Sequence, residues 1–365
     1  METMATATLV AWLGFGLGGA FGIVAEHANF CTMGGLSDRV LFGDGRRLRA
    51  WVLAMAIALI GTQTLELAGL IELKKSIYLG ANLPWLGALL GGAIFGFGMT
   101  LTGGCANKTL VRLGGGSLKA LVVILVLAAT AYMTLRGLFA PLRLGLDRVS
   151  ALDLKAVGDQ GLPTLLAWAT GLPAASARTV TTAIGGGALL WFALGDRAFR
   201  TSPRDLVAGV LIGLLAIGGW VATGIAGRDD FEPVPLASLT FVGPSAETLM
   251  YGMVFTGATI NFGIAVVGGV VIGAFLSARA RGSFRLEGFA DLSDLARHLA
   301  GATMMGIGGV FAGGCTIGQG LTGLSTLAAG SVLAILGIVG CAILGLRYLE
   351  EGSVWRAFRS VLACC

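Results

Sequence analysis

Three of the six cysteines stand beside glycine or asparagine inside otherwise apolar stretches. Cys105 and Cys315 end two similar segments, GFGMTLTGGC and GIGGVFAGGC, and Cys31 ends the triplet NFC. A thiol is polarizable and a weak hydrogen-bond donor, so it suits a solute with a soft atom such as sulfur, selenium or Cu(I). The sequence leaves two interpretations open: the three thiols line one pathway, or each is a small hydrophobic residue in a core.

The remaining cysteines have simpler interpretations. Cys341, in GIVGCAILG, fits a small hydrophobic residue, and Cys364 and Cys365 are tail thiols at the chain end. No cysteine pair has CxxC spacing, and the two histidines are far apart in the chain. We therefore expect no metal site and no cofactor.

Polar residues and glycine pairs surround the three motif cysteines and break the apolar pattern. Such breaks indicate helices that stop partway through a membrane, which is tolerated where the backbone lines a cavity. Helix N-termini attract anions, and a nearby lysine adds positive charge. Soft donors beside positive dipoles favour a sulfur-bearing anion over a cation. The candidate pathway residues are Cys31, Cys105 and Cys315, supported by Asn29, Gly103, Gly104, Asn107, Lys108, Gly313, Gly314, Thr316 and Gln319.

The composition is that of a membrane protein. Of 365 residues, 55% are hydrophobic and only 12% are charged, with a mean hydropathy of +0.85. About 20 apolar residues span a bilayer as a helix. Long stretches lack Asp, Glu, Lys and Arg: Thr3–Ala25, Ser76–Asn107, Leu206–Gly227, Thr248–Ala278 and Leu299–Leu346. The sequence predicts an all-α polytopic membrane protein with about nine transmembrane spans.

The charge distribution predicts an orientation in the bilayer. Most arginines cluster in short loops, and positive loops face the cytoplasm. The net charge of +5 is therefore explained without nucleic-acid binding. The acidic segment RDDFEPVP, residues 228–235, is expected outside. The N-terminus is predicted outside and the C-terminus in the cytoplasm.

An internal repeat divides the chain. The two Gly-Gly-Cys segments match each other, and the Asn29-Phe30 pair before Cys31 resembles Asn261-Phe262. We predict two pseudo-symmetric halves with broken or re-entrant helices: residues 1–135 with the Cys31 and Cys105 motifs, a connecting region at 136–178, and residues 179–365 with the Cys315 motif. Duplicated halves with glycine-interrupted helices are typical of transporters. Whether the halves are inverted stays open, and most of the 60 glycines are expected to serve close helix packing.

Several enzyme classes find no support. The sequence has no phosphate-binding loop, and its GxG motifs fall inside predicted helices. Glu26 and His27 are the nearest thing to a proton-transfer pair, but an interfacial anchor is the simpler interpretation, and His298 is expected to be structural. We predict no catalytic residues and no enzymatic activity.

The motifs resemble a known family. The segments HANFCTMGG (His27–Gly35), GFGMTLTGGCANKTLVRLGGGS (Gly96–Ser117) and GIGGVFAGGCTIGQGLTG (Gly306–Gly323) are similar to the three cysteine motifs of the YeeE/YedE family of bacterial sulfur-transport membrane proteins. The resemblance covers residues 7–135 and 179–346 and leaves 135–178 unmatched.

The resemblance implies an hourglass-like protein of the bacterial inner membrane that takes up thiosulfate. Its motif cysteines, here Cys31, Cys105 and Cys315, would guide the ion by S–H···S hydrogen bonds, and a small cytoplasmic TusA-like sulfur carrier protein would be a partner. Two alternatives stay open: an importer of selenium or another sulfur species, and a membrane sulfurtransferase that forms a cysteine persulfide.

Overall fold

The computed structural model describes residues 6–229 and 234–363. Cys364, Cys365 and residues 230–233 of the predicted external segment lie outside the described residues. Within the described part, the regular structure is helical apart from one short antiparallel pair of strands, in which Leu83 lies opposite Leu152. The predicted all-α class is confirmed.

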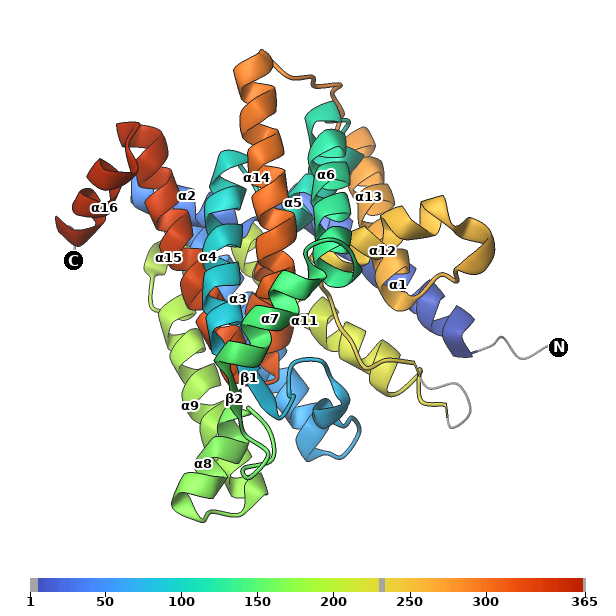
Figure 1. The fold of residues 1–365 in the computed structure, drawn as a ribbon, viewed down its shortest axis with the longest axis vertical. Helices are drawn as coiled ribbons and strands as arrows, with labels where there is room; N and C mark the ends of the chain where they lie inside the picture. Colours follow the sequence, from blue (N-terminus) through green and yellow to red (C-terminus); the bar gives the residue numbers. More distant parts are fainter. Residues whose placement is uncertain (1–5, 230–233, 364–365) are drawn as a thin grey trace.

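Figure 1 shows the helices and strands in their order along the chain. Residues before the connecting region form α1 (Thr6–His27), α2 (Thr32–Leu41), α3 (Arg46–Leu67), η1 (Leu73–Lys75), β1 (Asn82–Pro84), α4 (Trp85–Leu101), α5 (Ala106–Gly114) and α6 (Leu118–Arg136). The connecting region forms α7 (Ala140–Ser150), β2 (Ala151–Asp153) and α8 (Leu162–Thr170). The rest forms α9 (Ala174–Leu194), α10 (Arg197–Arg200), α11 (Pro203–Gly224), α12 (Val242–Met253), η2 (Phe255–Gly257), α13 (Phe262–Ala280), α14 (Leu292–Phe311), η3 (Gly318–Gly323), α15 (Ala329–Glu351) and α16 (Val354–Ala363).

Seven helical segments of the described chain are long and apolar enough to cross a membrane. They are Thr6–Leu41, Arg46–Leu67, Trp85–Gly114, Leu118–Arg136, Pro203–Gly224, Phe262–Ala280 and Ala329–Glu351. Two less apolar helices, α9 with 21 residues and α14 with 20, also have the necessary length. The chain is a multi-pass membrane protein, and the number of long helices agrees with the prediction.

The repeat-related helices α4 and α14 lie side by side and antiparallel. Gly91, early in α4, lies against Phe311 at the end of α14, whereas Gly98, late in α4, lies against Gly301. Each also has a parallel neighbour: α4 packs along α15, and α6 packs along α14 (Figure 1). The repeat-related helices therefore run in opposite directions, as they would in inverted halves, while the division into two halves stays a prediction.

Glycines bring the helix backbones together, most visibly between α1 and α13. A Cβ added at Gly18 would lie 2.2 Å from the carbonyl oxygen of Val266, and one at Gly22 would lie 2.3 Å from that of Val270. Gly269 and Gly273 of α13 approach α1 equally closely. No side chain fits at these positions, so these glycines serve the close packing that was expected for most of them.

The connecting region folds against one end of the molecule. Strand β2 pairs with β1, and the Gln160 side chain accepts a hydrogen bond from the Gly330 amide at the start of α15. The Leu162 amide donates to the Leu327 carbonyl oxygen. Residues 136–178 are thus attached to both halves, but the boundaries chosen at 135 and 178 stay a prediction.

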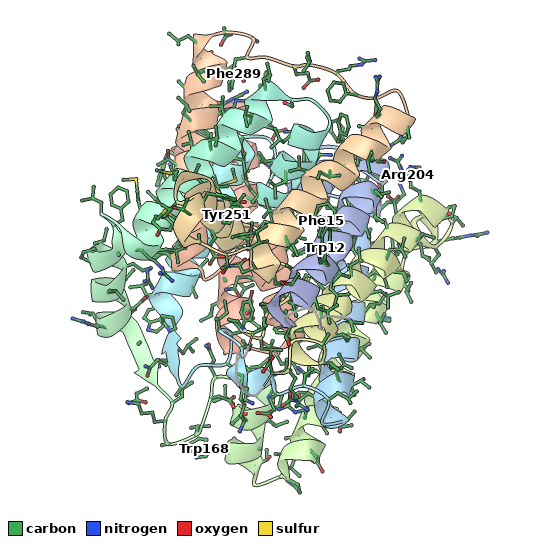
Figure 2. All side chains as sticks on the ribbon, turned by 90° about the vertical axis from the view of Figure 1, so that its right-hand side faces the viewer. Trp12, Phe15, Trp168, Arg204, Tyr251 and Phe289 are labelled. Carbon is green, nitrogen blue, oxygen red and sulfur yellow. The ribbon has the colours of Figure 1, made fainter. Side chains whose placement is uncertain are left out.

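The basic loops gather at the opposite end. Arg204 donates to the carbonyl oxygen of His27, Arg281 pairs with Glu26 at 3.1 Å, and Arg49 pairs with Asp196 at 3.4 Å. Figure 2 shows the two ends clearly, with Phe289 near one and Trp168 near the other. The arginine clusters that the sequence assigned to one side of the membrane do lie together.

Candidate functional site

The two Gly-Gly-Cys segments adopt the same backbone conformation. Gly103 and Gly313 have φ values of +64° and +72°, in the left-handed region that favours glycine. The next glycine amide reaches back five residues in each case, from Gly104 to the Met99 carbonyl oxygen and from Gly314 to that of Gly309. This pattern is the Schellman motif, which ends a helix. The predicted helix breaks are therefore present in both halves.

Each motif cysteine stands at the start of a new short helix. Cys31 precedes α2 and Cys105 precedes α5, both with extended backbone at the N-cap. Cys315 precedes a helical turn that continues into the π-helix η3. The Sγ atoms of Cys31 and Cys315 accept hydrogen bonds from the amides of Gly34 and Gly318, both at 3.4 Å. Three helix N-termini thus carry a thiol at their first position.

The three thiols lie together in the interior. Cys31 is 4% exposed, and Cys105 and Cys315 are fully buried. Cys31 and Cys105 are close enough for their side chains to interact, and Cys105 also lies near Thr316 and Cys315. Sequence positions almost 300 residues apart therefore meet in one cluster, which we call the thiol cluster (Cys31, Cys105 and Cys315).

A cavity of about 800 Å³ opens at the end where the basic loops gather; we call it the basic cavity. Its charged lining comprises Lys108, Arg112, Lys119, Arg204, Arg281, Arg285 and Arg297 against Glu26, Glu287 and Asp294. Glu26 and Asp294 are already paired, with Arg281 and Lys119 respectively. Among the described residues, Lys108 and Arg112 have no carboxylate partner within 4.0 Å. This cavity is therefore suited to an anion.

A second cavity, of about 670 Å³, lies on the other side of the thiol cluster; we call it the opposite cavity. Its lining includes Tyr78, Thr240 and Asn261, with Arg143 and Gln160 from the connecting region. The Gly313-Gly314 turn and the Gln319 side chain form part of its wall. The connecting region, which matched no known pattern, thus contributes to the lining of a cavity.

The predicted pathway residues divide between these three places. Asn29, Gly103 and Lys108 line the basic cavity, and the Lys108 ammonium donates to Asn29 Oδ1. Gly313, Gly314 and Gln319 line the opposite cavity. Asn107 and Thr316, like the cysteines, line neither cavity and are buried between them. A Cβ added at Gly104 would lie 3.2 Å from Cγ of Lys108.

Sequence reasoning missed Arg112 and Tyr78. The Arg112 guanidinium lies against the Gly103-Gly104 turn, 3.6 Å from where a Cβ on Gly104 would stand. Its spacing of four residues from Lys108 on one helix was an available signal, because such residues share a face. Tyr78, which lines the opposite cavity together with Thr240, comes from a loop whose sequence carries no comparable signal.

The residues that the sequence analysis left out of the pathway have surroundings that fit a structural role. Glu26 accepts hydrogen bonds from Ser277 and Ser283 in addition to its ion pair, which fits an interfacial anchor. His298 Nδ1 lies 3.1 Å from Asp294 Oδ1, within α14. Cys341 is half-buried on α15 and lines neither cavity. The described residues contain no cluster of His, Cys, Asp or Glu that could hold a metal ion.

Comparisons with known proteins show what this chain is similar to. A family model described as sulphur transport matches residues 27–344. The chain is 29% identical over 328 residues to the thiosulfate transporter TsuA of Escherichia coli (strain K12), which covers 83% of this chain and 84% of that protein. It is 28% identical over 338 residues to the thiosulfate transporter TsuA of Spirochaeta thermophila, covering 86% and 91%.

A shorter match, 33% identical over 98 residues, relates it to the probable transporter YedE of Escherichia coli and covers 27% of this chain and 22% of that protein. These matches confirm the predicted resemblance and the expectation of a transport protein that is not an enzyme. With the family model covering most of its length, the chain belongs to the sulphur transport family.

Proposed function

We propose that this protein takes up thiosulfate across the bacterial inner membrane by passing it along Cys315, Cys105 and Cys31. The observation that carries the proposal is the position of the thiol cluster, which is buried between the two cavities. None of its three cysteines lines either cavity. Each thiol stands at a helix N-terminus, where backbone amides favour an anion.

Thiosulfate is the substrate that this chemistry favours. It differs from sulfate by one soft terminal sulfur, and a thiol can donate a weak S–H···S hydrogen bond to that atom. Neutral thiols bind weakly enough to release the ion, whereas a thiolate would repel a dianion. Two relatives that each match more than four-fifths of the chain are named thiosulfate transporters. An importer of another sulfur species or of selenium would use the same soft contacts and is the second candidate.

The basic cavity is the cytoplasmic one in this proposal. Lys and Arg are enriched on the cytoplasmic side of membrane proteins. The last turns of α1 and α15, with Glu26 and Leu349, both line the basic cavity. Both helices therefore end in the cytoplasm, the N-terminus lies outside, and thiosulfate moves from the opposite cavity towards increasing positive charge. A small TusA-like sulfur carrier protein would then collect the sulfur at the basic cavity.

Uptake of labelled thiosulfate into proteoliposomes tests the proposal. We expect Cys105→Ala and Cys315→Ala to lower the uptake rate at least tenfold, because each removes one step of the pathway, while Cys341→Ala keeps wild-type uptake. Competition by sulfate, sulfite and selenite identifies the substrate. Wild-type uptake by the triple variant of Cys31, Cys105 and Cys315 would contradict the relay.

Serine variants separate hydrogen bonding from covalent chemistry. A hydroxyl donates a hydrogen bond but cannot carry a persulfide, so partial uptake by Cys105→Ser supports a relay. A sulfurtransferase would instead move the outer sulfur of thiosulfate onto a cysteine thiolate with release of sulfite, and mass spectrometry of the intact protein would detect the resulting persulfide.

A further inference from the structure

We propose that Thr32, Asn107 and Thr316 form a hydrogen-bond donor site for the oxygen atoms of the transported anion. The proposal rests on the function proposed above and adds a second element of recognition to it. The thiol cluster would contact the soft sulfur, and these three side chains would contact the hard oxygens of the same ion.

The first observation is that these donors are buried without partners. Thr32 and Asn107 are fully buried, and Thr316 is 1% exposed. The hydroxyls of Thr32 and Thr316 and the Nδ2 atom of Asn107 make no hydrogen bond of normal geometry. Buried polar groups in native proteins almost always have a partner, so a cluster of exceptions calls for a ligand or another explanation.

The second observation is where these donors stand. Thr32 and Thr316 directly follow Cys31 and Cys315, and Asn107 is two residues after Cys105. All three are therefore in the first turn of the short helices that begin at the thiols. Thr316 also lies beside the Cys105 thiol, which links the second half of the chain to the first. Each of the three motifs thus supplies one unpartnered donor within two residues of its cysteine.

The orientation of Asn107 adds specificity. Its Oδ1 atom accepts a hydrogen bond from the Cys105 thiol. The amide oxygen is thereby occupied, and Nδ2, which can only donate, is left free. An unpaired carbonyl would repel an oxyanion, whereas an unpaired N–H attracts one. In the empty site this hydrogen bond holds the amide in the orientation that favours an anion, and the single S–H group of Cys105 turns from Asn107 to the sulfur when the ion arrives.

Separate contacts to the sulfur and to the oxygens explain how one site can bind the two ends of a thiosulfate ion. Sulfur is a soft and weak acceptor, and the three oxygens are hard and stronger acceptors. Hydroxyl and amide donors in a buried site are neutral, so they bind the oxygens without the desolvation cost of a buried cation. The two cations nearest to the pathway, Lys108 and Arg112, stay at the basic cavity.

Variants of the three donors test the site in proteoliposomes with labelled thiosulfate. We expect Thr32→Val, Thr316→Val and Asn107→Asp each to lower kcat/KM at least about tenfold, since hydrogen bonds to charged groups are worth that much. Thr32→Ser and Thr316→Ser keep the hydroxyl and should stay within about threefold of wild type. Thr62→Val is the matched control, because Thr62 is also fully buried and unpartnered but lies on α3 outside the motifs.

Two further measurements separate recognition from a structural role. Thermal unfolding without ligand should be unchanged or shifted upwards in the valine variants, because an unpaired hydroxyl is replaced by a methyl of similar shape. The stabilisation that thiosulfate gives the wild type should be lost. Inhibition of uptake by sulfate, which presents only oxygens, should weaken in the variants, while inhibition by hydrosulfide, which has none, should not change.

The results decide between the two proposals. If the wild type does not transport thiosulfate, the proposed function fails. If it does, but the valine variants match it, or lose thermal stability without ligand, or lose inhibition by sulfate and hydrosulfide equally, the donor site is wrong and the thiosulfate function stands.

Discussion

At the scale of single residues, the site depends on two glycines with positive φ. Gly103 and Gly313 end α4 and α14 and turn the chain so that the following cysteine starts a new helix. A residue with a Cβ is strained in this conformation. At Gly313 a Cβ would also lie 2.9 Å from Nε2 of Gln319, whose side chain is held by Ser331 and the Ala312 carbonyl oxygen. Substitution here should disturb the opposite cavity directly.

We expect Gly313→Ala to destabilise the protein by about 1 kcal/mol or more and to lower thiosulfate uptake. Gly187→Ala, on an open face of α9, is the control and should be neutral or slightly stabilising, because alanine favours a helix. Thermal unfolding in detergent and proteoliposome uptake measure the two effects. Equal behaviour of the two variants would show that the turn is not constrained.

The sequence allowed the cysteines and the glycine breaks to be predicted, because each motif is local. Gly-Gly followed by a cysteine and polar residues violates the apolar pattern within a few positions. The absence of a partner at Thr32 or Asn107 could not be predicted, since it depends on side chains distant in the chain. The contact between Cys105 and Thr316 joins residues more than 200 positions apart, which no local pattern contains.

At the scale of elements, the long helices form a frame and the short helices carry the chemistry. Helices α1 and α13 run parallel and contact each other along their glycines. Helix α2 follows directly from α1 through Asn29, which itself has a φ of +53°. The position of Cys31 therefore depends on how closely α1 approaches α13.

We expect Gly18→Val to destabilise the protein by about 1–3 kcal/mol or more, because its side chain would meet the backbone of Val266. Gly16→Val, two residues earlier on the same helix, meets nothing within 4 Å and is the matched control. Thermal unfolding of both variants in the same detergent checks the difference. A similar loss in both would mean that valine is unfavourable in α1 as such.

Sequence patterns predicted these helices but not how they are arranged relative to one another. Apolar stretches predicted the long helices, and the repeat predicted equivalent α4 and α14. Loop charges alone do not show whether the halves are inverted, and the opposite cavity carries charges of both signs, such as Arg143 and Asp147. The antiparallel contact of Gly91 with Phe311 and of Gly98 with Gly301, which inverted halves would require, joins residues more than 200 positions apart.

At the scale of the whole molecule, two cavities face opposite ends and a buried layer separates them. The basic cavity carries an excess of positive charge, whereas the charged residues of the opposite cavity are Arg143, Asp147 and Glu247. An anion that crosses the thiol cluster therefore moves towards positive charge.

Cysteine labelling tests this orientation. In a background with Cys364 and Cys365 replaced by serine, we expect Trp168→Cys to react with a membrane-impermeant maleimide in intact spheroplasts. Leu286→Cys should react only after permeabilisation. Both side chains are well exposed, at 68% and 75%, and Figure 2 shows Trp168 at the end away from Phe289. The reverse labelling pattern would place the basic cavity outside.

The glycine contact between α4 and α14 also limits the mechanics of a transport cycle. These helices come from different halves and touch through their backbones, and a Cβ on either Gly98 or Gly301 would lie 2.7 Å from the other's carbonyl oxygen. Rocking one half against the other would have to open this seam and leave a void that no side chain fills. We therefore expect this contact to stay closed during transport, with conduction confined to small movements of the three short helices, so that cross-linking α4 to α14 would leave uptake intact.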